Sequence, residues 1–304
     1  MIPEYREHFL PPPLSAWVEC VWFLRAGPQA PGTPSDRVFP DGCVEMIFQM
    51  GGRTRAASVP GAFRPQPSAF LIGPLASPLF LEPVASEPMR TLGVRFRPGA
   101  AAVFLPFPVD VLSRGGGEAP IDLVFGGAGR ELEDRLAGAR SDRGRIALVE
   151  SFLLRRLAAA PIRSPGLPRS SNRGLGGRDR PVALAVSRML RARRFPVSRL
   201  ARDCGWSPRQ LERRFHTETG LSPRLLARII RFQRVFRELG SGARDWVSVA
   251  LDCGYADQAH LIRDFREFSG ETPAAFVRAG PSLAGAFLAP ERLERFFEGA
   301  GAEG

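Results

Sequence analysis

The first part of the chain, to roughly residue 125, alternates short apolar runs with turn residues. Apolar runs of strand length occur at 17–24, 43–50, 70–73, 79–84 and 92–96. Proline and glycine punctuate them, as in the turn signal Phe39-Pro40-Asp41-Gly42. Many short strands divided by such turns are typical of a β-barrel or a β-sandwich.

The pattern then changes from strand spacing to helix spacing. Residues 130–139 and 142–160 place apolar side chains three and four positions apart, which predicts two helices. The second helix carries one apolar stripe, which consists of Ile146, Val149, Leu153, Leu154 and Leu157. Such a stripe packs either on the strands or on a second subunit, and packing on the core is the more common fate.

A stretch of Pro, Gly, Ser and Arg separates these elements from a purely helical pattern. Residues 161–180 contain almost no apolar side chains, which predicts a flexible linker. The expected organisation is therefore a β-rich domain with a helical end at 1–160, the linker at 161–180, a helical domain at 181–280 and a tail at 281–304.

The helical domain contains an internal repeat. LARDCGW at 200–206 matches VALDCGY at 249–255, and RRFHTETGLSP at 213–223 matches RDFREFSGETP at 263–273. In each copy a short helix ends at Cys-Gly, a polar turn follows, and a second helix has apolar residues four positions apart. Two short helices joined by a glycine-containing turn predict a helix-turn-helix unit in each copy.

The second helix of each unit is predicted to meet DNA with its polar face. In the first copy this helix begins at Ser207-Pro208, and inward-facing Leu211 and Phe215 leave its opposite face to polar side chains. A recognition helix meets base edges in the major groove with residues near its N-terminus. The candidate DNA-binding residues are Ser207, Arg209, Gln210, Glu212, Arg213 and Arg214 in the first copy and Gln258, Ala259, His260 and Arg263 in the second. The second set has fewer hydrogen-bonding groups, so we expect more base readout from the first.

On these motifs, residues 181–280 resemble the DNA-binding domain of AraC/XylS-type transcriptional regulators. The matching positions include Cys204-Gly205, Ser207-Pro208 and Gly220 in the first copy, and Cys253-Gly254 and Gly270 in the second. The resemblance implies two helix-turn-helix units joined by a long helix, here from about Pro223 to Leu239. It also implies duplex DNA as the partner, with the recognition helices about one DNA turn, roughly 34 Å, apart. RNA polymerase is the implied protein partner.

The N-terminal half resembles the sensor module that precedes such domains. VFPDGCVEMIF at 38–48 and GVRFRPGAA at 93–101 carry this resemblance, which implies a cupin-like barrel, a helical dimerisation segment and an unknown small-molecule effector. Arg95 and Arg97 share one face of a predicted strand, so they are candidates for binding an anionic effector. Surface or inter-domain ion pairs are the alternative.

The charge distribution agrees with a nucleic-acid partner at one end of the chain. The formal net charge is +11, and all 42 basic residues are arginine. Residues 1–160 carry 17 arginines against 16 acidic residues, so nearly all of the excess lies beyond residue 160. GC-rich codon usage explains most of the preference for arginine over lysine, so the asymmetry is more informative than the total.

Several classes of site are not indicated. The four cysteines have no C-x-x-C spacing and the chain has only three histidines, so neither a metal nor another cofactor is expected. No catalytic motif is recognisable, so we expect no enzyme activity. No apolar run approaches the ~20 residues of a membrane helix and no signal peptide is recognisable, which predicts a cytoplasmic location without a membrane partner.

The sequence therefore predicts an α+β protein, with a cupin-like sensor followed by an all-α domain of two helix-turn-helix units. The predicted function is sequence-specific, effector-responsive transcription regulation. Two alternatives remain: a DNA-modifying or repair enzyme fused to a helix-turn-helix domain, and a regulator whose N-terminal domain binds a protein. A homodimer is compatible with the resemblance.

Overall fold

The computed structural model describes residues 4–28, 35–84, 87–113, 117–159, 181–192, 196–240, 245–279 and 290–298. The linker predicted at 161–180 lies outside the described residues. We refer to residues 4–159 as the sheet region and to residues 181–298 as the helical region.

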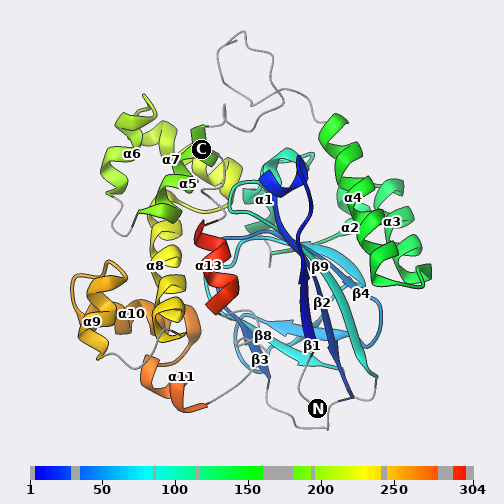
Figure 1. Cartoon of the computed structure of the whole chain (residues 1–304), viewed down its shortest axis with the longest axis horizontal. Helices are drawn as coiled ribbons and strands as arrows, with labels where there is room; N and C mark the ends of the chain where they lie inside the picture. The colour runs from blue at the N-terminus through cyan, green and yellow to red at the C-terminus, as the bar shows by residue number, and fades with distance from the viewer. Residues whose placement is uncertain are drawn as a thin grey trace.

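The strands of the sheet region form two antiparallel sheets (Figure 1). The larger has the order β1-β2-β9-β4-β7-β10, and the smaller has the order β3-β8-β5-β6. The strand bounds are β1 Glu4–His8, β2 Val18–Ala26, β3 Asp36–Val38, β4 Glu45–Gln49, β5 Thr54–Ala57, β6 Arg64–Pro65, β7 Ala69–Ile72, β8 Leu79–Pro83, β9 Met89–Phe96 and β10 Glu118–Pro120. All five predicted strands are confirmed. Strands β1, β3, β5, β6 and β10, which carry fewer large apolar side chains, were not predicted.

The larger sheet is buried on both faces, which explains why β2 is an almost continuous apolar run. One face carries Val21, Met46 and Val94 against helices α2 Ile121–Phe125, α3 Gly127–Gly138 and α4 Asp142–Ala159. The other face carries Trp22 and Leu24 toward the smaller sheet. The predicted stripe on α4 is confirmed at Val149 and Leu153, whereas Leu154 is 38% exposed. Phe152 takes a core position that the stripe did not include.

The helical region contains both predicted helix-turn-helix units. The helix bounds are α5 Pro181–Arg191, α6 Val197–Asp203, α7 Pro208–Thr219, α8 Pro223–Gly240, α9 Trp246–Asp252, α10 Gln258–Ser269, α11 Pro273–Ala279 and α13 Pro290–Glu298. The predicted connector at 223–239 is α8. Both α7 and α10 end at a left-handed glycine, Gly220 at φ 73° and Gly270 at φ 80°, which closes the helix without a Cβ clash. The α+β fold class is therefore confirmed.

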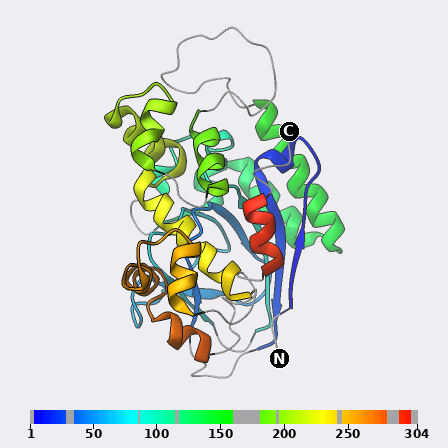
Figure 2. The same ribbon diagram turned by 60° about the vertical axis from the view of Figure 1, so that its left-hand side comes forward.

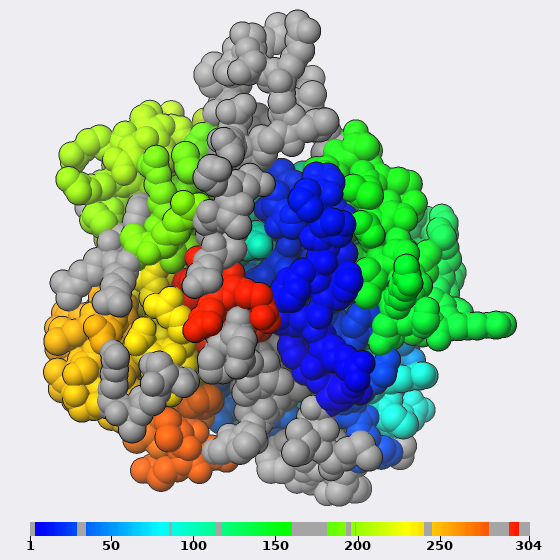
Figure 3. Space-filling view, in the orientation of Figure 1, coloured from blue at the N-terminus to red at the C-terminus, as the bar shows by residue number. Residues whose placement is uncertain are grey.

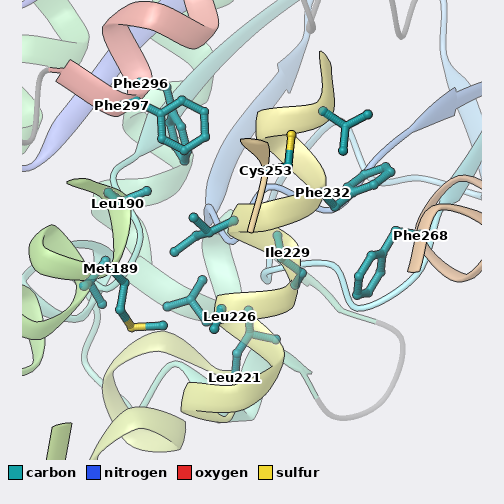
Figure 4. Packing of buried hydrophobic residues seen from close by; sticks show 14 of the residues in the cluster. Met189, Leu190, Leu221, Leu226, Ile229, Phe232, Cys253, Phe268, Phe296 and Phe297 are labelled. Atoms are coloured by element: carbon teal, nitrogen blue, oxygen red, sulfur yellow. The ribbon is translucent and has the colours of Figure 1, made fainter. Parts of the chain in front are cut away.

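The core of the helical region is arranged around α8. Leu226, Ile229 and Phe232 of α8 are buried against the other helices (Figure 4). Predicted inward-facing residues of both units lie in this core, namely Leu211, Phe215, Leu261 and Phe265. The two units therefore share one hydrophobic core, so their relative orientation is fixed by side-chain packing.

Helix α13 also belongs to this core, although the sequence analysis assigned residues 281–304 to a tail. Leu293, Phe296 and Phe297 are buried, and Figure 4 shows the two phenylalanines beside α8 and Leu190 of α5. In two views α13 lies between α8 and the first strands (Figures 1 and 2). The space-filling view shows it as a red band between the yellow helical surface and the blue N-terminal surface (Figure 3).

The sheet region contacts the helical region through a segment that follows β3. The ring of Phe39 lies 5.8 Å from that of Phe236 and 6.0 Å from that of Phe232, so a side chain of the sheet region enters the helical core. Gln233 Nε2 donates a hydrogen bond to the carbonyl oxygen of Pro40 (2.6 Å). Arg37 donates to the carbonyl oxygen of Ser269, at the end of α10 (3.0 Å).

A second contact joins the sheet region to the end of α7. The amide of Val109 donates to the carbonyl oxygen of Thr217 (2.8 Å), and Ser113 Oγ donates to that of Gly220 (3.0 Å). The sheet region thus holds the C-terminal ends of both second helices, α7 here and α10 through Arg37. Their N-terminal ends point away from these contacts.

Candidate nucleic-acid interface

The first helix-turn-helix unit consists of α6 and α7 and is joined by a tight turn at Gly205, whose φ is 66°. The start of α7 is a capping box: Ser207 Oγ accepts from the amide of Gln210 (3.2 Å), and Gln210 Oε1 accepts from the amide of Ser207 (2.8 Å). These two predicted DNA-binding side chains are therefore engaged with the helix start, although both residues are exposed.

The outer face of α7 carries the remaining candidates of the first unit. Arg209, Glu212 and Arg213 are all exposed, on the side of the helix opposite buried Leu211 and Phe215. Arg214 is half-buried, and its guanidinium stacks over the ring of Trp206 at 4.6 Å. The first unit thus presents two arginines and a glutamate within one helical turn to solvent.

The second unit consists of α9 and α10 and repeats this geometry, with fewer exposed charged side chains on its second helix. Asp257 caps α10 by accepting from the amide of His260 (2.7 Å). Ala259 and Arg263 are exposed, whereas Gln258 is half-buried. His260 is also half-buried, with its ring edge-on to Tyr255 at 5.1 Å. Arg263 is therefore the charged candidate with full exposure on α10.

An ion-pair cluster fixes α10 relative to the connector α8. Arg228 donates to Asp264 Oδ1 from both Nε (3.1 Å) and Nη2 (2.8 Å), and to Glu267 Oε1 (3.0 Å). Hydrogen bonds to Glu267, and then to Asp264, raise the pKa of Arg228. The structure therefore uses the Arg228 side chain to orient the recognition helix α10.

The cysteines before the turn glycines serve packing. Cys253 is fully buried in the helical core, and burial raises the pKa of its thiol to about 12. Cys204 is half-buried, and burial raises its thiol pKa as well. Both residues are small side chains at the packed junction between the two helices of a unit.

A cavity of about 100 Å³ lies between the two sheets. Its walls are mainly apolar and include Leu24, Ile47, Phe70, Leu79 and Leu81. One end is charged, with Arg95, Asp41 and Glu45 in the lining.

The two arginines predicted to bind an effector are not brought together. Arg95 is 1% exposed and is ion-paired with Glu45 (2.6 Å) and Asp41 (3.5 Å) at the cavity. Arg97 follows the end of β9, is absent from the cavity lining, and donates to the carbonyl oxygen of Ser15 (3.1 Å). Whether either binds an effector stays a prediction.

The sequence analysis missed the buried ionic cluster behind this end of the cavity. Glu7, Glu19, Asp41 and Glu45 meet Arg95 and, from helix α13, Arg292. Burial raises the pKa of Glu19 and of Glu45. A signal did exist in the spacing of Arg292 with Leu293, Phe296 and Phe297, which puts one arginine on the apolar face of a short helix.

Within the described parts of the chain, no group of three or more His, Cys, Asp or Glu side chains is arranged to hold a metal ion. None of the described helices has both the length and the apolarity that crossing a membrane requires.

Two family matches divide the chain in the same way as its architecture. Residues 200–279 match a helix-turn-helix domain, and residues 7–115 match a domain of unknown function, DUF6597. The first match covers both structural repeats and the connector α8. No curated protein matches the chain significantly.

Solved structures with some similarity include ToxT from Vibrio cholerae, at 10% identity and a TM-score of 0.44, over 85% of this chain and 97% of ToxT. A ToxT structure bound to (E)-4-(8-methylnaphthalen-1-yl)but-3-enoic acid matches at 9% identity and a TM-score of 0.43, over 84% and 97%. The DNA-binding domain of AdpA, in complex with a target DNA, matches at 30% identity and a TM-score of 0.29, over 33% and 87%.

The paired units on a shared connector define a helix-turn-helix DNA-binding protein. The family match and the duplicated motif together assign residues 200–279 to the AraC-type helix-turn-helix domains.

Proposed function

We propose that the protein is an effector-responsive regulator that reads two adjacent major-groove segments of duplex DNA, one with α7 and one with α10. Residues 181–280 are the DNA-binding domain, and residues 1–160 are the sensor. The exposed outer face of α7, with Arg209 and Arg213, is the observation that carries this proposal. Arginine forks of this kind recognise the guanine edge bidentately.

The shared core supports simultaneous reading by both helices. Because α7 and α10 pack on the same connector, and Arg228 fixes α10 to α8, the two helices form a rigid pair. A rigid pair of recognition helices favours successive major-groove segments on one face of the duplex. RNA polymerase as a protein partner and a homodimeric assembly are further parts of this proposal.

The alternative of a DNA-repair enzyme, in the form that transfers an alkyl group to a cysteine, finds less support. Such chemistry needs a thiolate nucleophile. Burial raises the pKa of all four thiols, Cys20, Cys43, Cys204 and Cys253, and so keeps them protonated. Regulation through the cavity of the sheet region is the function that the geometry favours.

The test is the affinity of the full chain for a duplex obtained by random-library selection. Arg213→Ala is expected to weaken binding by ~1–3 kcal/mol and to relax preference at one base pair. The matched control is Arg130→Ala, which removes the same charge from an exposed position on α3. Equal weakening on all duplexes would make Arg213 a phosphate contact, and no weakening at all would remove α7 from the interface.

A further inference from the structure

The charged end of the cavity has an excess of carboxylates. Glu7, Glu19, Asp41 and Glu45 lie within one cluster, and each side chain is at most 16% exposed. From the sheet region, Arg95 pairs with Asp41 and Glu45, and the charge of Arg97 acts on Glu19. A buried carboxylate is either protonated or paired with a cation, so this excess of carboxylates over arginines favours a further cation.

Arg292 supplies a cation to this cluster from helix α13, more than 250 residues after its carboxylate partners in sequence. Its guanidinium lies 3.4 Å from Glu7, 3.7 Å from Glu19 and 3.6 Å from Asp41, and its side chain is 4% exposed. The carboxylates therefore accommodate a planar, two-pronged cation that does not belong to the sheets.

The apolar part of the cavity has room for a hydrocarbon group next to this charged end. Its volume of about 100 Å³ is smaller than the ~150 Å³ of a dry cavity that binds benzene, so it suits a short branched hydrocarbon. An anionic head would have to displace Glu45 or Asp41 from Arg95, with which both are already paired. A cationic head would instead add to the charge balance at Asp41 and Glu45.

We propose that the cavity binds a small apolar molecule with an amine or amidinium head. This head forms an ion pair with Asp41, for which it competes with Arg292. This inference deepens the proposed function and rests on it, because it treats the cavity as the effector site. It differs from the sequence-based expectation of an anionic effector held by Arg95 and Arg97.

Helix α13 gives this competition a consequence for the DNA-binding domain. Its apolar face lies on α8 and α5, and Arg234 and Arg237 stack over the ring of Phe297 at 5.3 and 5.0 Å. Its charged side reaches the sheet region through Arg292 and Arg295. A ligand that displaces Arg292 breaks one of the ionic contacts between the two regions. By linkage, docking of α13 lowers the affinity of the cavity for the ligand.

The test uses three probes with one skeleton: isobutyramidine (cation), isobutyramide (neutral) and isobutyrate (anion), titrated into the full chain and followed by NMR. The cation is expected to bind at least ten-fold more tightly than the other two. Asp41→Asn should remove this preference, since asparagine keeps the hydrogen bond from the amide of Cys43 (2.8 Å) but not the charge. Arg292→Ala should raise the affinity for the cation alone, because Arg292 no longer competes with the cation for Asp41.

The matched control is Arg130→Ala, which removes an exposed arginine from α3, outside both α13 and the cavity lining, and should leave all three affinities unchanged. The inference is overturned if isobutyrate or isobutyramide binds as tightly as the cation, if none of the three binds, or if Asp41→Asn leaves the preference intact. A DNA-binding measurement on the same preparation distinguishes failure of the proposed function from failure of the proposed ligand class. Loss of DNA binding refutes the proposed function, whereas intact DNA binding without cation preference refutes only the ligand class.

Discussion

Replacement of Phe39 by alanine is expected to release the sheet region from the helical region. Phe39 belongs to the sheet region, yet its ring is 6% exposed and touches the rings of Phe232, Phe236 and Phe276, all on helices. Buried Phe→Ala changes cost ~3–5 kcal/mol. Since the lost contacts join two regions, this cost falls on their docking and shifts the docking equilibrium by a factor on the order of 10²–10⁴.

Hydrogen exchange of single amides measures this shift. The amide of Val109 donates across the interface to Thr217, so it exchanges when the two regions separate. In Phe39→Ala its exchange should accelerate by roughly the same factor of 10²–10⁴. The amide of Val94, in the middle of the larger sheet, is the internal control and should keep its protection.

Equal acceleration at both amides would mean that Phe39 stabilises the sheet region itself. No acceleration at Val109 would mean that Phe39 does not hold the two regions together. Either outcome would refute the reasoning from its ring contacts.

Three further predictions concern the helical region. Phe215→Ala should lower the free energy of unfolding by ~3–5 kcal/mol because the side chain is fully buried, and an unchanged melting temperature would show that it is not core. Arg228→Met should weaken DNA binding through the orientation of α10 while circular dichroism stays unchanged, and full retention of affinity would contradict the tethering role of the Asp264 ion pair. Cys253, with a thiol pKa of about 12, should resist alkylation at pH 8 in the folded protein and react once unfolded; equal rates in both states would contradict its burial.

Local patterns predicted the helix-turn-helix units well because each unit is specified by residues close in sequence. Ser207-Pro208 starts α7, Gly220 ends it, and Leu211 with Phe215 defines its inner face, all within fourteen residues. The strands were predicted where both faces are apolar, as in β2. The short β5 and β6 carry little periodicity, so their positions are decided by pairing with partners far along the chain.

The contacts between the two regions were not predictable in the same way. In the sequence, Phe39 is part of a predicted turn. Only its neighbours in the folded protein show that it belongs to the helical core. Arg292 lies beyond the recognisable repeat, and its carboxylate partners Glu7, Glu19 and Asp41 are more than 250 residues earlier. Ion pairs of this sequence separation leave no local pattern that identifies the partner, so the carboxylate partners of Arg292 were not predicted.

The most direct test of the account is random-library DNA selection with the full chain, repeated with Arg213→Ala and with Arg263→Ala. Two specified segments are expected, with centres about one helical turn, roughly 10 base pairs, apart, and each variant should lose preference in a different segment. A single specified segment, or both variants affecting the same one, would contradict the claim that α7 and α10 read DNA together.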